Sequence, residues 1–203
     1  MHKLSILLFL VAGAFALSFQ SAPDAGGYQI GDTAEDFNLP SVKGKNVSMA
    51  SIKNAKGYVV IFTCNHCPYA KAYEQRIIEL HKKYAPLGFS VLAISPNDPK
   101  IQPDDSFDKM KKLAKMKKYP FAYLFDETQD VAKAFGATRT PHVYVLDQNR
   151  VVRYIGALDD NSEDAAKVKE PYASQAIEAL LAGKEVPVKE TKAIGCSIKW
   201  KKS

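Results

Sequence analysis

The sequence predicts one α/β domain built around a single sheet, and two patterns indicate it. Continuous runs of β-branched and aromatic residues, typical of strands buried on both faces, alternate with segments whose apolar residues recur at helical spacing. The predicted order βαβ(α)βαββα places parallel strands joined by crossover helices before an antiparallel hairpin. The chain has 203 residues, of which 46% are hydrophobic and 25% are charged, which suffices for one sizeable core.

The first elements frame the most informative motif of the chain. Two short apolar pieces, residues 30–40 and 44–49, flank a turn and predict a β-hairpin. Residues 58–63 form a β-branched and aromatic run, which predicts a buried central strand. Residues 68–84 contain no glycine and no proline after Pro68, and their apolar positions recur at helical spacing. We therefore expect a strand, a cysteine pair and a helix in direct succession.

The remaining elements continue the alternation of strands and helices. A polar turn separates the last two predicted strands, as a hairpin requires. We expect strands over residues 89–94, 121–125, 143–147 and 151–155, a short helix over 131–135 that Gly136 closes, and a last helix over 172–181 with Gly183 just past its end.

Positive charge is concentrated in one segment. The formal net charge is +6, and six lysines lie between Lys109 and Lys118. Met110, Leu113 and Met116 recur three apart there, so we expect a solvated amphipathic helix that lies over the core through a narrow apolar stripe. Docking of an acidic partner is the alternative. Nucleic acid is not an expected partner, because the sequence has no motif for it.

The N-terminus has the pattern of a signal peptide. A short basic start precedes an uncharged run over residues 4–17, and small and polar residues follow. We expect cleavage after Ala16 or Ser18, which makes residues 1–18 the signal peptide and the protein exported, periplasmic or secreted. The run is shorter than the roughly 20 residues of a spanning helix, so we expect no stable membrane span after cleavage. An uncleaved anchor is the alternative.

Two of the three cysteines share the motif Thr63-Cys64-Asn65-His66-Cys67-Pro68. It stands where the predicted central strand ends and a helix begins, and functional groups gather at the carboxyl ends of such strands. Unpaired N–H groups and the helix dipole favour a thiolate there, so we expect the pKa of Cys64 to lie below its ordinary value of about 8.5. Cys67 is close enough to resolve a mixed disulfide formed on Cys64.

His66 precedes the second cysteine of the pair. Its imidazole could stabilise the Cys64 thiolate further, which would make the couple more oxidising. The alternative for His66 is an exposed polar side chain without a role. For the cysteine pair the alternatives are a structural disulfide and half of a zinc site, but a zinc site needs two more ligands at motif spacing and the sequence has none. We therefore expect no metal and no cofactor.

Three segments together resemble the thioredoxin-like superfamily, in particular its branch between TlpA-type redoxins and peroxiredoxin-like proteins. Residues 31–39 are similar to the opening "GxxAPDFxL", the cysteine motif stands on the strand-to-helix turn, and residues 136–143 are similar to "GVxxTP" before a strand. The resemblance implies a thioredoxin-like fold over residues 28–183, with a central mixed β-sheet flanked by helices, an N-terminal β-hairpin and a helical insertion. Residues 184–203 would then form a C-terminal tail.

The resemblance also implies a cis peptide bond between Thr140 and Pro141 that faces the cysteine pair. In this family the residue before the proline offers its backbone to a bound substrate chain. A structural and a catalytic role are equally expected for His142, which follows. The chain departs from thioredoxins at Tyr58, which stands where they carry the acid that handles the proton of the second cysteine.

The third cysteine, Cys196, lies in the tail. Residues 192–200 resemble a C-terminal signature of a peroxiredoxin-like subgroup of uncharacterised redoxins. We expect Cys196 to be a buried or free thiol in a packed tail. The alternative is a resolving thiol that forms a disulfide with Cys64 or Cys67.

These features predict an exported thiol–disulfide oxidoreductase whose redox pair is Cys64 and Cys67. Its expected partners are protein thiols or disulfides and an unidentified redox partner. A peroxiredoxin-like thiol peroxidase is the first alternative, although neither cysteine stands in the "PxxxTxxC" frame of peroxiredoxins. A Cu(I)-binding module of the same fold is the second alternative, because soft thiolate ligands suit that ion.

Overall fold

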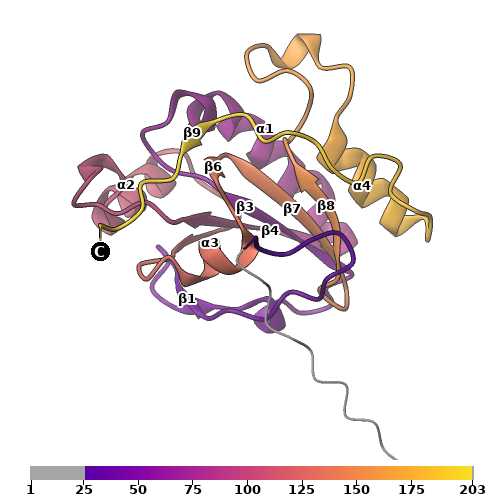
Figure 1. The fold of residues 1–203 in the computed structure, drawn as a ribbon, viewed down its shortest axis with the longest axis horizontal. Helices are drawn as coiled ribbons and strands as arrows, with labels where there is room; N and C mark the ends of the chain where they lie inside the picture. Colours follow the sequence, from indigo (N-terminus) through magenta and orange to yellow (C-terminus); the bar gives the residue numbers. More distant parts are fainter. Residues whose placement is uncertain (1–25, 203) are drawn as a thin grey trace, which may run out of the picture.

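The computed structural model describes residues 26–202, which form a five-stranded sheet flanked by helices (Figure 1). The strands are β1 (Leu39–Pro40), β2 (Asn46–Val47), β3 (Gly57–Phe62), β4 (Phe89–Ser95), β5 (Ala122–Phe125), β6 (Arg139–Thr140), β7 (His142–Asp147), β8 (Val152–Gly156) and β9 (Cys196–Ser197). The sheet has the order β5-β4-β3-β7-β8, with parallel pairing from β5 to β3 and antiparallel pairing from β3 to β8. Together with the β1–β2 hairpin, this confirms the predicted fold class.

Helices cover both faces of the sheet. They are α1 (Pro68–Tyr84), α2 (Phe107–Met116), α3 (Asp130–Phe135) and α4 (Tyr172–Leu181), with the short 3-10 helices η1 (Met49–Ser51), η2 (Ala85–Leu87), η3 (Pro103–Asp105) and η4 (Ala165–Lys167). One buried cluster packs α1, α2 and α4 against one face of the sheet. A second cluster packs α3 and the N-terminal segment against the opposite face. The four α-helices stand where the sequence predicts them.

Strand β3 lies at the centre because both of its faces are apolar. All six of its residues are buried. Val59 and Ile61 join the cluster that contains Tyr73 of α1, whereas Phe62 joins the cluster that contains Phe135 of α3. The loop that carries the first two cysteines therefore starts from a strand that is buried along its whole length.

The apolar stripe of α2 differs from the expected one. Met110 is fully buried, but Met116 is 67% exposed, so the prediction that Met116 lies over the core is wrong. At about 100° per residue, Met116 lies about 120° around the helix from Met110, whereas Ala114 lies only about 40° away. Ala114 is accordingly the other buried residue of this helix.

After α4 the chain returns across the sheet as an extended tail, drawn in yellow in Figure 1. The N–H of Thr191 donates to the carbonyl of Ile155, and the N–H of Ile155 donates to the carbonyl of Lys189, which fastens the tail to β8. Farther along, β9 pairs antiparallel with β6, and Cys196 lies opposite Thr140. The sequence predicts neither β6 nor β9, because strands of two residues carry no periodic pattern.

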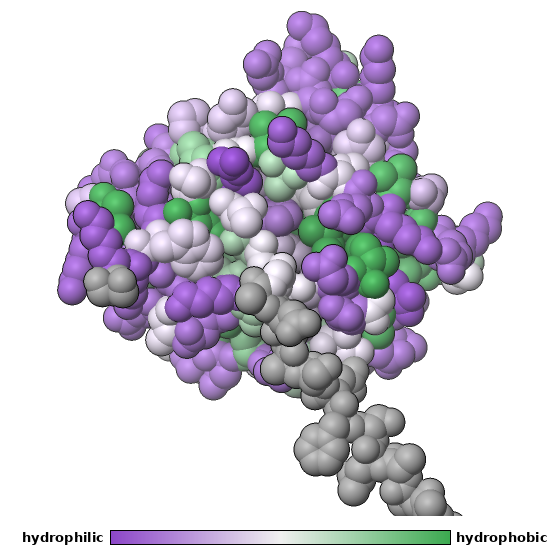
Figure 2. All heavy atoms as spheres, in the orientation of Figure 1, coloured by the Kyte–Doolittle hydropathy of each residue, from purple (hydrophilic) through white to green (hydrophobic). Residues whose placement is uncertain are grey.

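The face shown in Figure 2 is mostly hydrophilic, and its apolar residues form small, separated patches. Among residues 26–202, no helix is both long enough and apolar enough to cross a membrane. The expected signal peptide, residues 1–18, lies outside the described residues and stays a prediction.

Candidate active site

The three cysteines lie together at one edge of the sheet. Cys64 and Cys67 belong to the loop between β3 and α1, and Cys196 lies on β9. The sulfur of Cys67 is bonded to that of Cys196, with 6.0 Å between their Cα atoms, and Cys64 is the free thiol. The expectation that Cys196 is unpaired is therefore wrong. The two cysteines are 129 residues apart in the sequence. The β6–β9 pairing brings them together, and strands this short carry no pattern from which the pairing could be predicted.

Thr140 and Pro141 lie against these sulfurs, and the peptide bond between them is cis. The Thr140 hydroxyl lies 3.3 Å from the sulfur of Cys64, and the Thr140 carbonyl oxygen lies 3.1 Å from the sulfur of Cys67. Thr140 itself is fully buried. The structure thus brings together the cysteine motif and the Thr140-Pro141 pair, which are more than seventy positions apart in the sequence.

Burial raises the pKa of the Cys64 thiol to about 11, and the nearby charge of Asp105 adds to the rise. The Thr140 hydroxyl and two backbone N–H groups oppose this shift but do not overcome it. The expected lowering of the Cys64 pKa is therefore wrong. Helix α1 begins at Pro68 with Cys67 as its N-cap, so the positive end of the helix lies beside Cys67 and three residues beyond Cys64.

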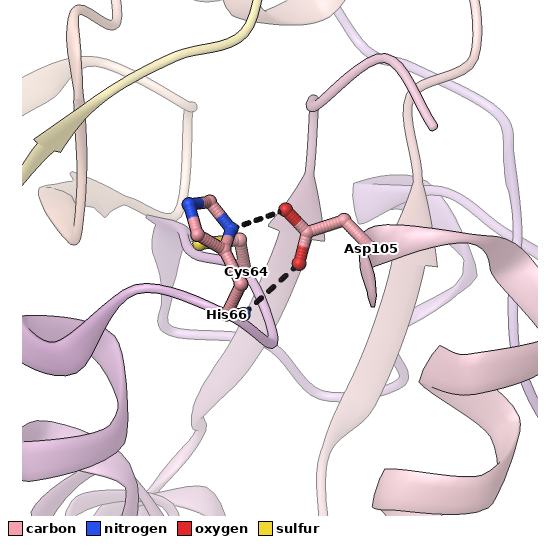
Figure 3. A group of neighbouring side chains, drawn as sticks. All are labelled: Cys64, His66 and Asp105. Atoms are coloured by element: carbon pink, nitrogen blue, oxygen red, sulfur yellow. Dashed lines mark hydrogen bonds and ion pairs between the residues drawn. The ribbon is translucent and has the colours of Figure 1, made fainter. Parts of the chain in front are cut away.

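Asp105, the last residue of η3, contacts the cysteine loop (Figure 3). In the sequence, η3 follows strand β4. The N–H groups of Asn65 and His66 donate to one carboxylate oxygen, at 2.7 and 3.1 Å. The His66 ring nitrogen Nδ1 lies 2.6 Å from the other oxygen, which also accepts a 2.7 Å bond from the side chain of Asn97. His66 is therefore an oriented and partly buried side chain, not a freely exposed one.

Cys64, His66 and Asp105 are residues of the types that serve elsewhere as a nucleophile, a base and a group that orients the base. One atom of each, a sulfur, a ring nitrogen and a carboxylate oxygen, lies within 4.8 Å of the others. Such an order suits proton transfer to and from the thiol. The same three groups could ligate a metal, but both Asp105 oxygens already accept two hydrogen bonds each, which uses their lone pairs.

None of the sequence motifs includes Asp105, so it is a site residue that the sequence did not predict. The signal that could have found it is topological. Asp105 follows β4, whose carboxyl end lies at the same edge of the sheet as the end of β3. A polar segment after a neighbouring parallel strand is therefore a place to search for a partner of the cysteine loop.

Replacing Asp105 by asparagine should lower the free energy of unfolding by about 2 to 4 kcal/mol, because a buried amide cannot accept all four hydrogen bonds. Chemical denaturation of the purified protein measures the change. Asp104→Asn is the matched control, since the Asp104 side chain is exposed and pairs only with Lys109, and it should leave the free energy of unfolding nearly unchanged. Equal losses in the two variants would contradict this role of Asp105.

The raised pKa of Cys64 predicts how the free thiol responds to pH. In the chain with the Cys67–Cys196 bond intact, alkylation of Cys64 by iodoacetamide should accelerate about tenfold per pH unit between about pH 7 and pH 10, because only the thiolate reacts. Mass spectrometry of the modified peptide follows the reaction, and Cys64→Ser gives the background. A rate that levels off below about pH 8 would show a stabilised thiolate instead.

His142 follows the cis bond but does not join the sulfur cluster. Its Nδ1 accepts a 3.4 Å hydrogen bond from the N–H of Thr138 and lies 3.4 Å from the hydroxyl of Tyr144. Burial lowers the pKa of His142 to about 4, so the ring is neutral at neutral pH. These contacts support the structural role of the two that the sequence allows.

Acid should destabilise the fold through His142. The unfolded chain binds a proton at this residue near pH 6.5, whereas the folded chain does so only near its pKa of about 4. The free energy of unfolding should therefore fall by up to about 3 kcal/mol as the pH drops between these values. Denaturation of His142→Gln over the same range should lack this part of the fall, and identical profiles would exclude it.

Comparisons with known proteins agree on the kind of chemistry. The model of the AhpC/TSA family matches residues 30–155. The thiol-disulfide oxidoreductase ResA of Oceanobacillus iheyensis is 28% identical over 161 residues, which cover 76% of this chain and 80% of that protein. The chloroplastic peroxiredoxin Q of Oryza sativa subsp. japonica is 28% identical over 132 residues, which cover 62% of this chain and 57% of that relative's length.

One solved structure is similar over nearly the whole domain. It is that of an uncharacterized conserved protein from Geobacillus kaustophilus, with 41% sequence identity and a TM-score of 0.81. The match covers 86% of this chain and 94% of that one.

Proposed function

The chain belongs to the AhpC/TSA family, and from this premise we propose that it is a thiol–disulfide oxidoreductase that acts on exported proteins through Cys64 and Cys67. One observation carries the proposal: the free thiol of Cys64 lies in the same buried cluster as the Cys67–Cys196 disulfide. A thiol and a disulfide in contact exchange without an outside oxidant or reductant. The predicted signal peptide supports substrates outside the cytosol.

Substrate reduction takes two exchange steps. The Cys64 thiolate attacks a substrate disulfide, so one substrate sulfur bonds to Cys64 and the other leaves as a thiolate. Cys67 then attacks Cys64, which forms the Cys64–Cys67 bond and releases the substrate as a dithiol. The substrate gains two electrons and two protons, and the cysteine pair loses them. The same steps in reverse oxidise a dithiol.

Cys196 completes the cycle as the resolving thiol. It attacks Cys67, the disulfide passes to Cys67–Cys196, and Cys64 becomes a thiol again. A partner dithiol then reduces this bond, so its two thiols become a disulfide and both cysteines become thiols. Cys64 is 5% exposed and Cys67 is fully buried, whereas Cys196 is only half-buried, so Cys196 is the sulfur that this partner reaches.

His66 and Asp105 serve the proton of Cys64. The carboxylate orients the imidazole, which takes the proton when the thiol becomes a nucleophile and returns it afterwards. Because burial raises the pKa of Cys64, no stable thiolate stabilises the reduced form of the cysteine pair. This favours reduction of substrate disulfides over oxidation of substrate thiols. Thr140 and Pro141 lie beside the sulfurs that take part in the exchange, and Thr140 contacts both Cys64 and Cys67.

The likeness to peroxiredoxin Q supports a thiol peroxidase as the second candidate. Neither Cys64 nor Cys67 stands in the "PxxxTxxC" frame of peroxiredoxins, which speaks against it. Binding of Cu(I) is the weakest candidate, because the disulfide removes two of the three thiols that could serve as ligands.

Trapping of substrates on Cys64 tests the proposal. The double variant Cys67→Ser, Cys196→Ser keeps the nucleophile and lacks both thiols that could release a bound substrate. Expressed at full length in its host, it should carry exported proteins bound by a disulfide, which non-reducing gels and mass spectrometry identify. The control adds Cys64→Ser and should carry none.

A peroxide arm separates the two candidate activities. The same double variant is mixed with a low concentration of hydrogen peroxide, and sulfenic acid on Cys64 is labelled. Slow labelling together with trapped proteins fits the oxidoreductase. Rapid labelling with no trapped protein would reject it in favour of the peroxidase.

A further inference from the structure

We propose that residues 195–199 of the tail occupy the edge where a substrate chain binds, and that this edge takes an extended polypeptide segment with glycine before its cysteine and an apolar residue two positions after it. The inference rests on the proposed function and names its substrate class. The tail is then an intramolecular copy of the substrate, present at the edge while Cys196 is bonded to Cys67.

Register places the cysteine of such a segment at the reacting sulfurs. Cys196 lies opposite Thr140 in the β6–β9 pair, and Thr140 contacts the sulfurs of both Cys64 and Cys67. A chain that follows the path of β9 therefore delivers its cysteine to the motif without any movement of β6. Added strands of this kind are a common mode of peptide recognition.

The contacts that hold the tail beyond Cys196 use its backbone. Main-chain groups are the same in every sequence, so another extended chain could make these hydrogen bonds. They are Ile198 N–H to the Thr138 carbonyl at 3.3 Å, Lys199 N–H to the Asn97 side chain at 2.8 Å, Asp98 N–H and the Gln129 side chain to the Lys199 carbonyl at 2.9 Å each, and Lys201 N–H to the Gln129 side chain at 2.8 Å.

Two positions of the tail do restrict the side chain. A Cβ atom at Gly195 would lie 2.3 Å from the Thr140 carbonyl oxygen and 2.9 Å from the Pro141 nitrogen, so no larger residue fits on this path. Ile198 is only 4% exposed and belongs to the core cluster on its face of the sheet. Ser197 between them is exposed and free to vary. The pattern is glycine, cysteine, any residue, apolar residue.

Asn97 connects a chain on this edge to the proton relay. Its side-chain oxygen accepts from the Lys199 N–H, and its side-chain nitrogen donates to Asp105 at 2.7 Å. Asp105 in turn orients His66. A substrate backbone at the position of Lys199 would therefore fix the side chain that supports the carboxylate.

A peptide experiment tests the pattern. The full-length Cys196→Ser chain is reduced, and a synthetic peptide of residues 193–201 is added with its cysteine joined to thionitrobenzoate. The protein thiolate bonds to the peptide sulfur and the coloured thionitrobenzoate anion leaves, which absorbance follows. The peptide should react about tenfold faster than its Gly195→Val or Ile198→Asp version. Equal rates for the three peptides would overturn the inference.

A change in the tail itself gives a second test. In the Cys196→Ser chain, Gly195→Val should expel the tail from the edge and raise the rate of the matched peptide about tenfold, because the competing chain has gone. Gly26→Val is the control, since a side chain there meets nothing within 4 Å. An unchanged rate in a folded Gly195→Val chain would contradict the inference, and if that chain fails to fold, the peptide comparison decides.

The outcomes also separate this inference from the function beneath it. A chain that exchanges with none of the activated peptides lacks the proposed activity altogether. A chain that exchanges with all of them alike is an oxidoreductase without the proposed substrate pattern.

Discussion

Asp105 accepts four hydrogen bonds from a position sealed from water, and these bonds join segments that are far apart in the sequence. Two come from the backbone of the cysteine loop, one from the His66 ring and one from Asn97. Because Asn97 also binds the backbone of the tail, the same carboxylate links both cysteine-bearing segments, the loop with Cys64 and Cys67 and the tail with Cys196. A buried charge is costly unless it is fully hydrogen-bonded, so this geometry tolerates little change.

The position of Cys64 shows how two opposing effects on a thiol are decided. The end of a helix favours a thiolate, but the effect falls off within the first turn, and α1 starts four residues after Cys64. Burial disfavours the thiolate with no such dependence on direction. Cys64 is nearly inaccessible and lies near the Asp105 carboxylate, so desolvation and charge outweigh the helix and the nearby N–H groups in setting the pKa of the thiol.

Sequence reasoning succeeded where a pattern repeats and failed where a contact is unique. The buried run of β3, the helical spacing of α1 and the Cys64–Cys67 motif are local, and the structure has each of them where expected. The Asp105 contacts, the β6–β9 pair and the Cys67–Cys196 bond depend on chain segments that meet only in the folded domain. The sign of the Cys64 pKa shift failed for the same reason, because depth of burial has no local signature.

The Cys67–Cys196 bond also affects the stability of the domain and its resistance to proteases. It closes a loop of about 130 residues that contains four of the five strands of the sheet and all four α-helices. In the chain-entropy description, such a cross-link reduces the entropy of the unfolded chain and thereby stabilises the fold by about 5 kcal/mol. In each cycle of the proposed reaction the protein would alternate between a form with this cross-link and a form without it. It would be most vulnerable to proteases in the form that lacks the Cys67–Cys196 bond.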